Sequence, residues 1–208
     1  MMKKCIIFDV DGTLWNSSDG VIEAGNEIIE KELGIKNHLT QETIDRVMGL
    51  EVKEIAGIYF PWMDYEKGME LVLKCMDNEN AYLSKHGGVL YEHVEDVLKQ
   101  LSQKHDLMIV TNAQKGYVDA MFTAHSIGQY FKDYIEAGET GLPKGKNIQL
   151  MMERHGYKEA VYVGDTMKDY DACQEAHVPM IYCSYGFGQV DHYWKKIDSF
   201  SELLNIFE

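Results

Sequence analysis

Two carboxylates lie two residues apart near the start of the chain, where Asp9 and Asp11 follow the apolar run 5–8 and precede Gly12. Side chains of a strand alternate between its two faces, so this spacing sends both acids to the same side. Like charges this close raise each other's pKa unless a cation or a proton is shared between them. The pair predicts a metal site, a general acid or both, and an ordinary turn with solvated acids is the alternative.

A second pair of acids follows another apolar run, 160–163. Asp165 comes at the end of this run, and Asp169 lies one turn into the helix expected next, so both can face one crevice. Carboxylates suit a hard cation such as Mg²⁺, which prefers oxygen ligands. Asp169 by itself would also favour a helix N-terminus. Together with Asp9 and Asp11, these acids predict one shared site.

A hydroxyl and an amide follow a third apolar run, 107–110. Thr111 and Asn112 stand where this strand should end. A hydroxyl and free N–H groups at a helix start form an anion-binding site, directed here towards the sheet end that carries Asp9. Capping of a helix by Thr111 would explain the same two residues.

These residues need a scaffold that brings the ends of several strands together. Alternating strands and helices predict an α/β fold, a doubly wound, Rossmann-like parallel sheet whose strand C-termini border the ligand crevice. Five runs are expected to be its strands: 5–8, 107–110, 134–136, 160–163 and 179–183. Four further segments have the apolar period of helices: 91–104, 114–124, 147–155 and 199–207.

The pattern between the first strand and the rest of the sheet is helical throughout. Four stripes predict helices here: 21–33, 40–48, 51–60 and 63–84. The first should stop at Gly34, and Thr40 should cap the second. A polar connector over 15–19 and a glycine-containing linker at 85–88 should join this segment to the sheet. We therefore expect a core of residues 1–15 and 87–208, with an all-helical insertion of residues 16–86.

The composition limits compartment and partners. The chain has 208 residues, 45% of them hydrophobic, which suffices for one core and a small accessory domain. A formal net charge of −14 argues against nucleic acid or an anionic membrane as partner, because both would be repelled. No signal peptide or membrane span is expected. The four cysteines form no C-x-x-C pair, which favours reduced thiols and a cytoplasmic location.

The hexapeptide from Asp9 to Leu14, Asp-Val-Asp-Gly-Thr-Leu, closely resembles the first motif of the haloacid dehalogenase superfamily, in particular of its phosphatase and phosphotransferase branch. Thr111-Asn112, Lys144 and Gly164–Asp169 match the second, third and fourth motifs in order. The helical insertion resembles the small cap domain of that superfamily. The resemblance therefore covers essentially the whole chain.

The chain departs from the family pattern at two positions. Gly145 occupies the place of a proline that usually follows the lysine. Lys146 is near enough to supply the ammonium instead, although we favour Lys144, and a solvated lysine is a further alternative. Asn16 stands where relatives often have Asp, close to the expected cap hinge, so it should affect substrate contacts or lid motion more than chemistry.

The resemblance implies a covalent mechanism on the acids. Asp9 would attack phosphorus and form an aspartyl-phosphate, while Asp11 would protonate the leaving alkoxide and then activate water. Mg²⁺ would be held by Asp9, Asp165 and the backbone carbonyl of Asp11. Asp169 would orient the metal shell or the lysine.

The same resemblance implies a phosphate-binding set. Thr111, Asn112 and Lys144 would bind the phosphoryl oxygens, since an acid nucleophile facing a phosphate dianion needs a cation to offset repulsion. Closure of the cap would exclude bulk water. The implied partner is a small phosphorylated metabolite.

The resulting expectation is a Mg²⁺-dependent phosphatase, with phosphoglycolate phosphatase-like activity as one candidate. One alternative is a hexose-phosphate mutase of the beta-phosphoglucomutase type, and another is a catalytically silent binding or regulatory protein on the same scaffold. Dehalogenation is disfavoured, because its ester intermediate does not need the second Asp or the metal-binding Gly-Asp. A mutase cap should supply several basic residues for a second phosphate, whereas the segment between Trp15 and Ser84 has few: Lys31, Lys36, Arg46, Lys53, Lys67 and Lys74.

Overall fold

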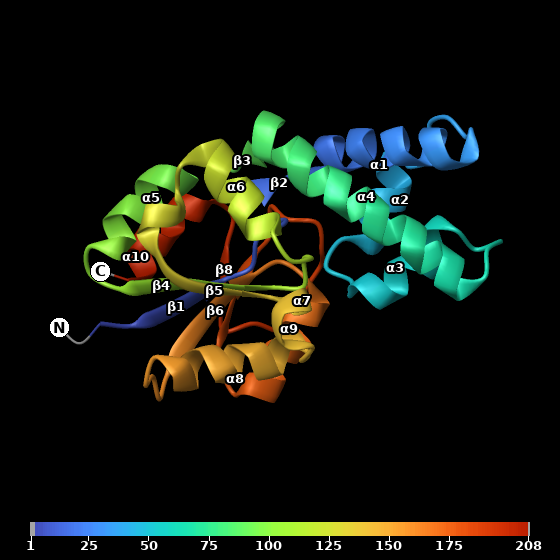
Figure 1. The fold of residues 1–208 in the computed structure, drawn as a ribbon. Helices are drawn as coiled ribbons and strands as arrows, with labels where there is room; N and C mark the ends of the chain where they lie inside the picture. Colours follow the sequence, from blue (N-terminus) through green and yellow to red (C-terminus); the bar gives the residue numbers. More distant parts are fainter. Residues whose placement is uncertain (1–2, 208) are drawn as a thin grey trace.

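The computed structural model describes residues 3–207, which form a six-stranded sheet with helices on both faces (Figure 1). The strand order is β5-β4-β1-β6-β7-β8, and every neighbouring pair is parallel. The strands are β1 (Cys5–Phe8), β4 (Asp106–Thr111), β5 (Phe131–Glu136), β6 (Ala160–Gly164), β7 (Met180–Cys183) and β8 (Lys195–Ile197). The predicted doubly wound α/β core is confirmed.

Strand β1 lies at the centre of the sheet, and its side chains divide between two packed layers. Ile6 and Phe8 belong to one apolar cluster, and Cys5 and Ile7 belong to the other. All four are buried, as expected for a parallel strand covered on both faces. The first layer is covered by α5 (Val94–Ser102), α6 (Tyr117–His125) and α10 (Leu203–Ile206), and the second by α8 (Lys144–Arg154) and α9 (Met167–Ala176) (Figure 1).

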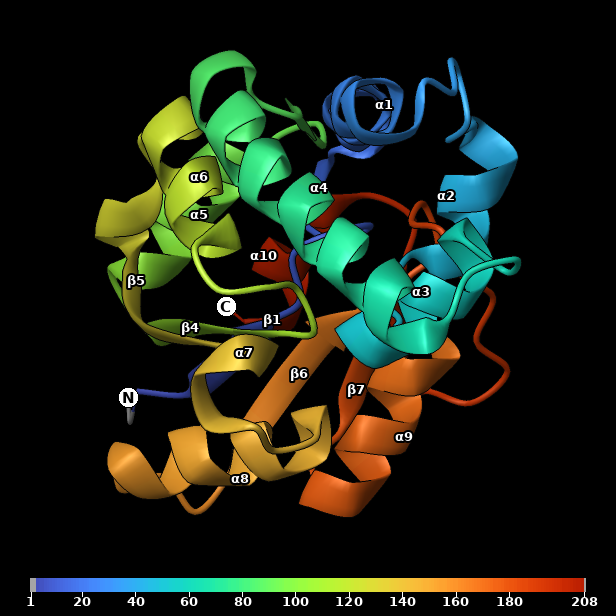
Figure 2. The same cartoon turned by 45° about the vertical axis from the view of Figure 1, so that its right-hand side comes forward.

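The segment after β1 forms the helical cap, which lies to one side of the sheet in Figure 1 and partly in front of it in Figure 2. Its helices are α1 (Ser18–Leu33), α2 (Gln41–Val47), α3 (Val52–Tyr59) and α4 (Tyr65–His86). Gly34 ends α1 in the left-handed conformation at φ 71°, and the Thr40 hydroxyl accepts a hydrogen bond from the Thr43 N–H at the start of α2. The insertion is thus helical where the sequence predicts helices.

The two connections between cap and core differ from expectation. Instead of a polar connector and a loose linker, β2 (Trp15–Asn16) pairs antiparallel with β3 (Val89–Leu90). α4 continues to His86, through the first residues of the expected linker. Trp15 is fully buried and packs edge-on against Tyr117, with ring centroids 5.6 Å apart. Strands of two residues are too short for an alternating pattern, so packing rather than sequence period defines them.

Other differences are at the edges of elements. β8 was not predicted, because its Lys-Lys-Ile sequence forms an edge strand with only one buried side chain. The short helix α7 (Ala137–Thr140) was also missed. The terminal segment is a 3-10 turn, Phe200–Glu202, followed by α10 rather than one helix. The predicted domain boundaries at 15/16 and 86/87 stay a prediction.

Within residues 3–207, none of the helices combines the length and the apolar character that a membrane crossing requires.

Replacing one buried and one exposed leucine tests this packing. Leu98 on α5 is fully buried, whereas Leu73 on α4 is 51% exposed. We expect Leu98→Ala to lower the free energy of unfolding by about 2–5 kcal/mol, through lost apolar burial and a residual cavity. Leu73→Ala should change it by less than about 0.5 kcal/mol. Urea unfolding followed by circular dichroism measures both, and equal losses would contradict the assignment of α5 to the core.

Candidate active site

The chain makes a sharp turn immediately after the central strand. The Asp9 N–H donates to the Val163 carbonyl at 2.9 Å, so Asp9 is still tied to β6. Gly12 then adopts φ +74°, and a Cβ atom there would lie 2.0 Å from Asp165 Oδ2. Only glycine accepts both the positive φ and this contact. The turn therefore brings the first and fourth motifs against each other.

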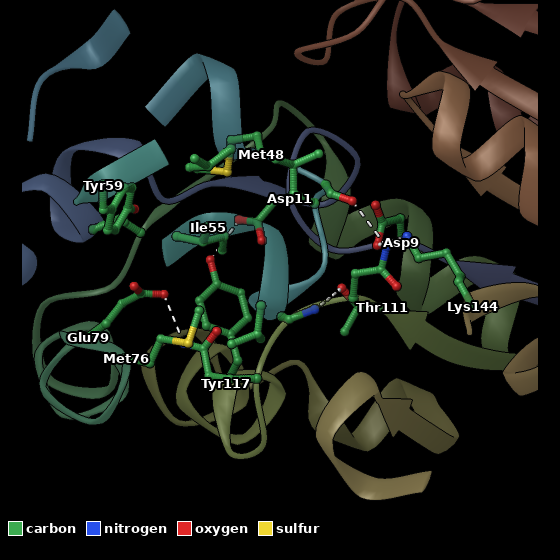
Figure 3. A pocket seen from close by; sticks show the side chains of 18 residues that line it. Asp9, Asp11, Met48, Ile55, Tyr59, Met76, Glu79, Thr111, Tyr117 and Lys144 are labelled. Atoms are coloured by element: carbon green, nitrogen blue, oxygen red, sulfur yellow. Dashed lines mark hydrogen bonds and ion pairs between the residues drawn. The ribbon is translucent and has the colours of Figure 1, made fainter. Parts of the chain in front are cut away.

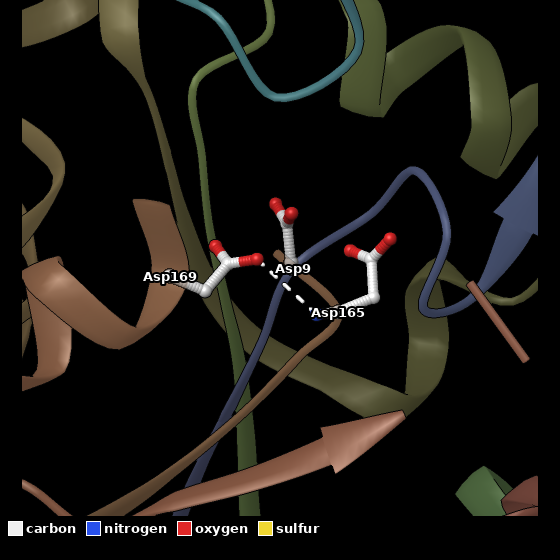
Figure 4. Close-up of side chains that lie close together, drawn as sticks. All are labelled: Asp9, Asp165 and Asp169. Carbon is white, nitrogen blue, oxygen red and sulfur yellow. Dashed lines mark hydrogen bonds between the residues drawn. The ribbon is translucent and has the colours of Figure 1, made fainter. Parts of the chain in front are cut away.

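Three carboxylates meet at this turn. Oxygen atoms of Asp9, Asp165 and Asp169 lie within 4.8 Å of one another, and all three side chains are buried (Figure 4). Asp169 is fully engaged: Oδ1 accepts from Lys144 Nζ at 2.6 Å, and Oδ2 accepts from the Thr166 N–H at 2.9 Å and the Thr166 hydroxyl at 2.8 Å. Asp169 thus holds the lysine and the loop rather than offering free oxygens.

The other two acids have oxygens to spare. Asp165 Oδ2 accepts from the Phe187 N–H at 2.8 Å, but Asp165 Oδ1 has no hydrogen-bond donor among the described residues. Asp9 Oδ1 likewise receives no hydrogen bond there, although Lys144 Nζ lies 3.1 Å away as an ion pair. Buried carboxylate oxygens without donors are costly unless a cation is bound. Asp9 and Asp165 therefore fit a hard divalent cation such as Mg²⁺.

The structure places Lys144 rather than Lys146 beside the acids. Lys144 lies in the first turn of α8, is 5% exposed, and lies between Asp9 and Asp169. Lys146 is exposed, with its ammonium 3.5 Å from Glu175. α8 thus begins at Lys144, three residues before the expected start at 147. A Cβ at Gly145 would lie 2.9 Å from the Ala172 carbonyl oxygen, so glycine lets α8 and α9 approach closely at this position.

Burial and charge move the pKa values of the acids apart. Burial raises the pKa of Asp9 to about 7, with Lys144 opposing and Asp169 adding to the rise. Burial also raises the pKa of Asp165 well above its usual range, and the charges of Asp169 and Asp9 add to this. Burial alone would raise the pKa of Asp169 as well, but the ammonium of Lys144 keeps it lowered. One lysine does not balance this group of acids, so the site lacks positive charge.

The side chain of Asp11 lies outside the three-acid cluster. Its Oδ1 accepts hydrogen bonds from the Ser17 hydroxyl and the Tyr117 hydroxyl, both at 2.7 Å. Burial raises the pKa of Asp11, while the bonds from Tyr117 and Ser17 lower it. Asp11 still lines the same cavity as Asp9, so the pair shares one volume. The expected metal contact of Asp11 concerned its backbone carbonyl and stays a prediction.

Thr111 and Asn112 lie where β4 ends and the loop that contacts the cap begins. Thr111 Oγ1 accepts from the Ala113 N–H at 3.2 Å, and Asn112 Nδ2 donates to the Gly49 carbonyl of the cap at 3.1 Å. The interpretation of Thr111 as a helix N-cap is wrong, because α6 begins at Tyr117 with Gly116 as its N-cap. Thr111 is thus the last residue of β4, Asn112 begins the following loop, and both line the cavity.

A cavity between cap and core joins these residues (Figure 3). Asp9, Asp11, Thr111, Asn112 and Lys144 line it from the core. The cap contributes mainly apolar side chains: Val21, Val47, Met48, Leu50, Val52, Ile55, Tyr59 and Met76. The structure thus brings five predicted site residues around one cavity, with Asp165 and Asp169 next to Asp9 in the acidic cluster.

Sequence reasoning missed four polar residues of this region. Ser17 and Tyr117 bond to Asp11, and Gln114 bonds to the buried cap residue Glu79. Asp11 and Tyr117 lie far apart in the chain, so no local pattern connects them. The only signal was the Ser17-Ser18 pair next to Asn16, which marks the cap hinge.

The two lysines provide a matched test of the charge balance. Lys144→Met should lower the free energy of unfolding by about 3–5 kcal/mol, because Asp169 and Asp9 would stay buried without their ammonium. Lys146→Met removes a surface ion pair and should change it by less than about 1 kcal/mol. Chemical denaturation at neutral pH compares the two. Losses of similar size would show that Lys144 does not neutralise the buried acids.

Cation binding can be tested without a substrate. We expect Mg²⁺ to raise the melting temperature. At a Mg²⁺ concentration one hundred times its Kd, binding should add about 2.7 kcal/mol to the free energy of unfolding. Asp165→Asn should remove most of this shift, because it weakens the carboxylate pair that faces the cation. Asp171→Asn, at an exposed aspartate on the following helix α9, should retain it. Thermal unfolding with chelator and with Mg²⁺ decides, and an unchanged shift in Asp165→Asn would contradict the site.

Known proteins resemble this chain in sequence. The family model for haloacid dehalogenase-like hydrolases matches residues 6–183. A phosphoglycolate phosphatase from Photobacterium profundum is 28% identical over 220 residues, covering 98% of this chain and 95% of that protein. A phosphoglycolate phosphatase from Shigella boydii is also 28% identical, covering 88% of this chain and 81% of that protein.

Solved structures share the fold. A haloacid dehalogenase-like family hydrolase from Streptococcus pneumoniae superposes with a TM-score of 0.84 at 22% identity, covering 99% of each chain. CbbY from Rhodobacter sphaeroides, determined in complex with phosphate, has a TM-score of 0.81 at 19% identity, covering 97% of this chain and 96% of that one. The family model extends from the central strand β1 to the end of β7, and the chain therefore belongs to the haloacid dehalogenase-like hydrolase family.

Proposed function

We propose that the protein is a Mg²⁺-dependent phosphatase that hydrolyses a small phosphate monoester through an aspartyl-phosphate on Asp9. The observation that carries this proposal is the position of Asp9. Its carboxylate lies at the end of the central strand, faces the cavity, and has an oxygen without a hydrogen-bond donor among the described residues. Relatives named phosphoglycolate phosphatase support the reaction class and make phosphoglycolate one candidate substrate.

The chemistry divides between the two acids of the first motif. An Asp9 oxygen attacks phosphorus, the ester oxygen leaves, and Asp11 gives that oxygen its proton. Asp11 then accepts a proton from water, which attacks the aspartyl-phosphate and releases inorganic phosphate. Hydrogen bonds from Ser17 and Tyr117 hold one oxygen of Asp11, so the other can serve in proton transfer.

The remaining site residues supply binding and charge. Asp9 and Asp165, with the backbone carbonyl of Asp11, would hold Mg²⁺, which would offset the negative charge of the acids and the phosphate. The Thr111 hydroxyl, with Asn112 and Lys144, binds phosphoryl oxygens. Asp169 positions Lys144 through their 2.6 Å contact. We place this activity in the cytoplasm, consistent with four free, buried cysteines.

Hydrolysis is favoured over transfer to a second sugar hydroxyl. A mutase must hold a bisphosphate, and its cap must bind the second phosphate with basic groups. Among the described lining residues, none that the cap supplies is basic. The test supplies hexose 1-phosphate with a trace of the bisphosphate and measures two products, hexose 6-phosphate from a mutase and inorganic phosphate from a phosphatase. Faster formation of the 6-phosphate than of inorganic phosphate would favour the mutase.

Replacement of the nucleophile is the direct test. Asp9→Asn should lower phosphate release by at least about 10³-fold, because removal of a nucleophile is not compensated by the remaining groups. It should also abolish the acid-quenched phosphoenzyme. Asp19→Asn, an exposed aspartate at the start of α1, should keep both. Release of phosphate from p-nitrophenyl phosphate with Mg²⁺ gives the rate, circular dichroism checks folding, and normal turnover by Asp9→Asn would refute the mechanism.

A further inference from the structure

The cap contributes one charged side chain to the cavity, Glu79 of α4 (Figure 3). Glu79 is 8% exposed, and its Oε1 accepts a hydrogen bond from Gln114 Nε2 at 2.9 Å. Gln114 is the only donor to this carboxyl group within the described part of the chain. One oxygen of a nearly buried acid is therefore left for a ligand.

Apart from Glu79, the cap wall of the cavity is mainly apolar. Tyr59, Ile55 and Met76 line the same cavity, and Tyr59 adds an aromatic ring to the cap wall. A polar group on the alcohol part of the substrate, which leaves in the reaction, would meet Glu79 and Gln114 as its polar contacts at the cap end of the cavity. A carboxylate beside an aromatic and apolar wall is suited to an ammonium group, through charge and cation–π attraction.

The charged side chains that line the cavity also favour a cationic group over an anionic one. Of the 18 residues that line it, Lys144 alone is basic, and its ammonium is already paired with Asp9 and Asp169. A second negative group on the substrate would be buried without a counter-charge and close to Glu79. Burying an unpaired charge is costly. The cavity therefore opposes a substrate with a carboxylate at the far end.

In the empty enzyme at neutral pH, the carboxyl group of Glu79 is mostly protonated. Burial raises the pKa of Glu79 to about 8, Gln114 opposes this, and the charge of Asp11 adds to it. A bound ammonium stabilises the ionised form. A protonated Glu79 would offer a carboxylate only a single O–H donor, which leaves most of its charge unsatisfied.

On the basis of the proposed phosphatase activity, we propose that Glu79 selects phosphate esters of amino alcohols, binding the substrate's ammonium group in the cap, and that it discriminates against phosphoglycolate. This assigns to Glu79 a role in substrate specificity, separate from the acids that perform the reaction. The proposed substrate preference thus differs from that implied by the name phosphoglycolate phosphatase, which the relatives carry.

A matched series of two-carbon phosphate esters tests the proposal. Phosphoethanolamine, 2-hydroxyethyl phosphate, ethyl phosphate and phosphoglycolate differ only in their second carbon, which is an ammonium-bearing CH2, a hydroxyl-bearing CH2, a methyl group or a carboxylate. We expect kcat/KM, measured by phosphate release with Mg²⁺, to be at least about tenfold higher for phosphoethanolamine than for ethyl phosphate, a difference of about 1.4 kcal/mol. Phosphoglycolate should be the poorest of the four.

Variants then assign the preference to one side chain. Glu79→Gln removes the charge at nearly constant shape and should bring the ammonium-to-methyl ratio of kcat/KM close to one. Glu66→Gln, at an exposed glutamate on the same helix, should leave the ratio and the activity unchanged. A ratio retained in Glu79→Gln would overturn the assignment.

The outcomes separate this inference from the reaction itself. Phosphoglycolate as the best substrate, equal rates for all four esters, or hydrolysis of p-nitrophenyl phosphate without hydrolysis of phosphoethanolamine would overturn the inference and leave the phosphatase intact. Failure to hydrolyse any ester, p-nitrophenyl phosphate included, would refute the proposed function and this inference with it.

Discussion

Negative charge gathered at the buried end of one strand is the constraint on which this structure depends. Carboxylate oxygens of Asp9, Asp165 and Asp169 lie within 4.8 Å of one another, and among residues 3–207 Lys144 is the single ammonium paired with them. Asp169 is neutralised by lysine and loop donors, whereas Asp9 and Asp165 keep oxygens without donors. The fold therefore stabilises one acid and leaves two open to a cation.

Backbone proximity is what makes this concentration of charge possible. Gly12 lies against one side of Asp165, and Gly186 lies against another, where a Cβ would come within 2.4 Å of the Asp165 Cβ. Gly145 allows the start of α8, and with it Lys144, to lie close to α9. Small residues thus occur where main chains must approach, while the sheet core carries the large side chains.

The sequence is most informative where a residue's role depends on strand position. Long apolar runs predict β1, β4, β6 and β7, and the parallel arrangement predicts that the residues after them meet. It favours Lys144 over Lys146 only through the family resemblance, because both lie near the start of one helix and tertiary packing is what buries the first. Tyr117 and Glu79 escape prediction for the same reason: each is an ordinary helix residue until another segment packs against it.

The paired strands β2 and β3 have a consequence for how such enzymes diversify. Asn16 lies opposite Val89 in this ribbon, so the chain leaves and re-enters the sheet domain at neighbouring points. An insertion whose ends are neighbours places little demand on the domain that receives it, and such sites tolerate exchange of whole segments. Evolution, or a protein engineer, can therefore replace the helical cap while the acids after β1 and β6 keep their geometry.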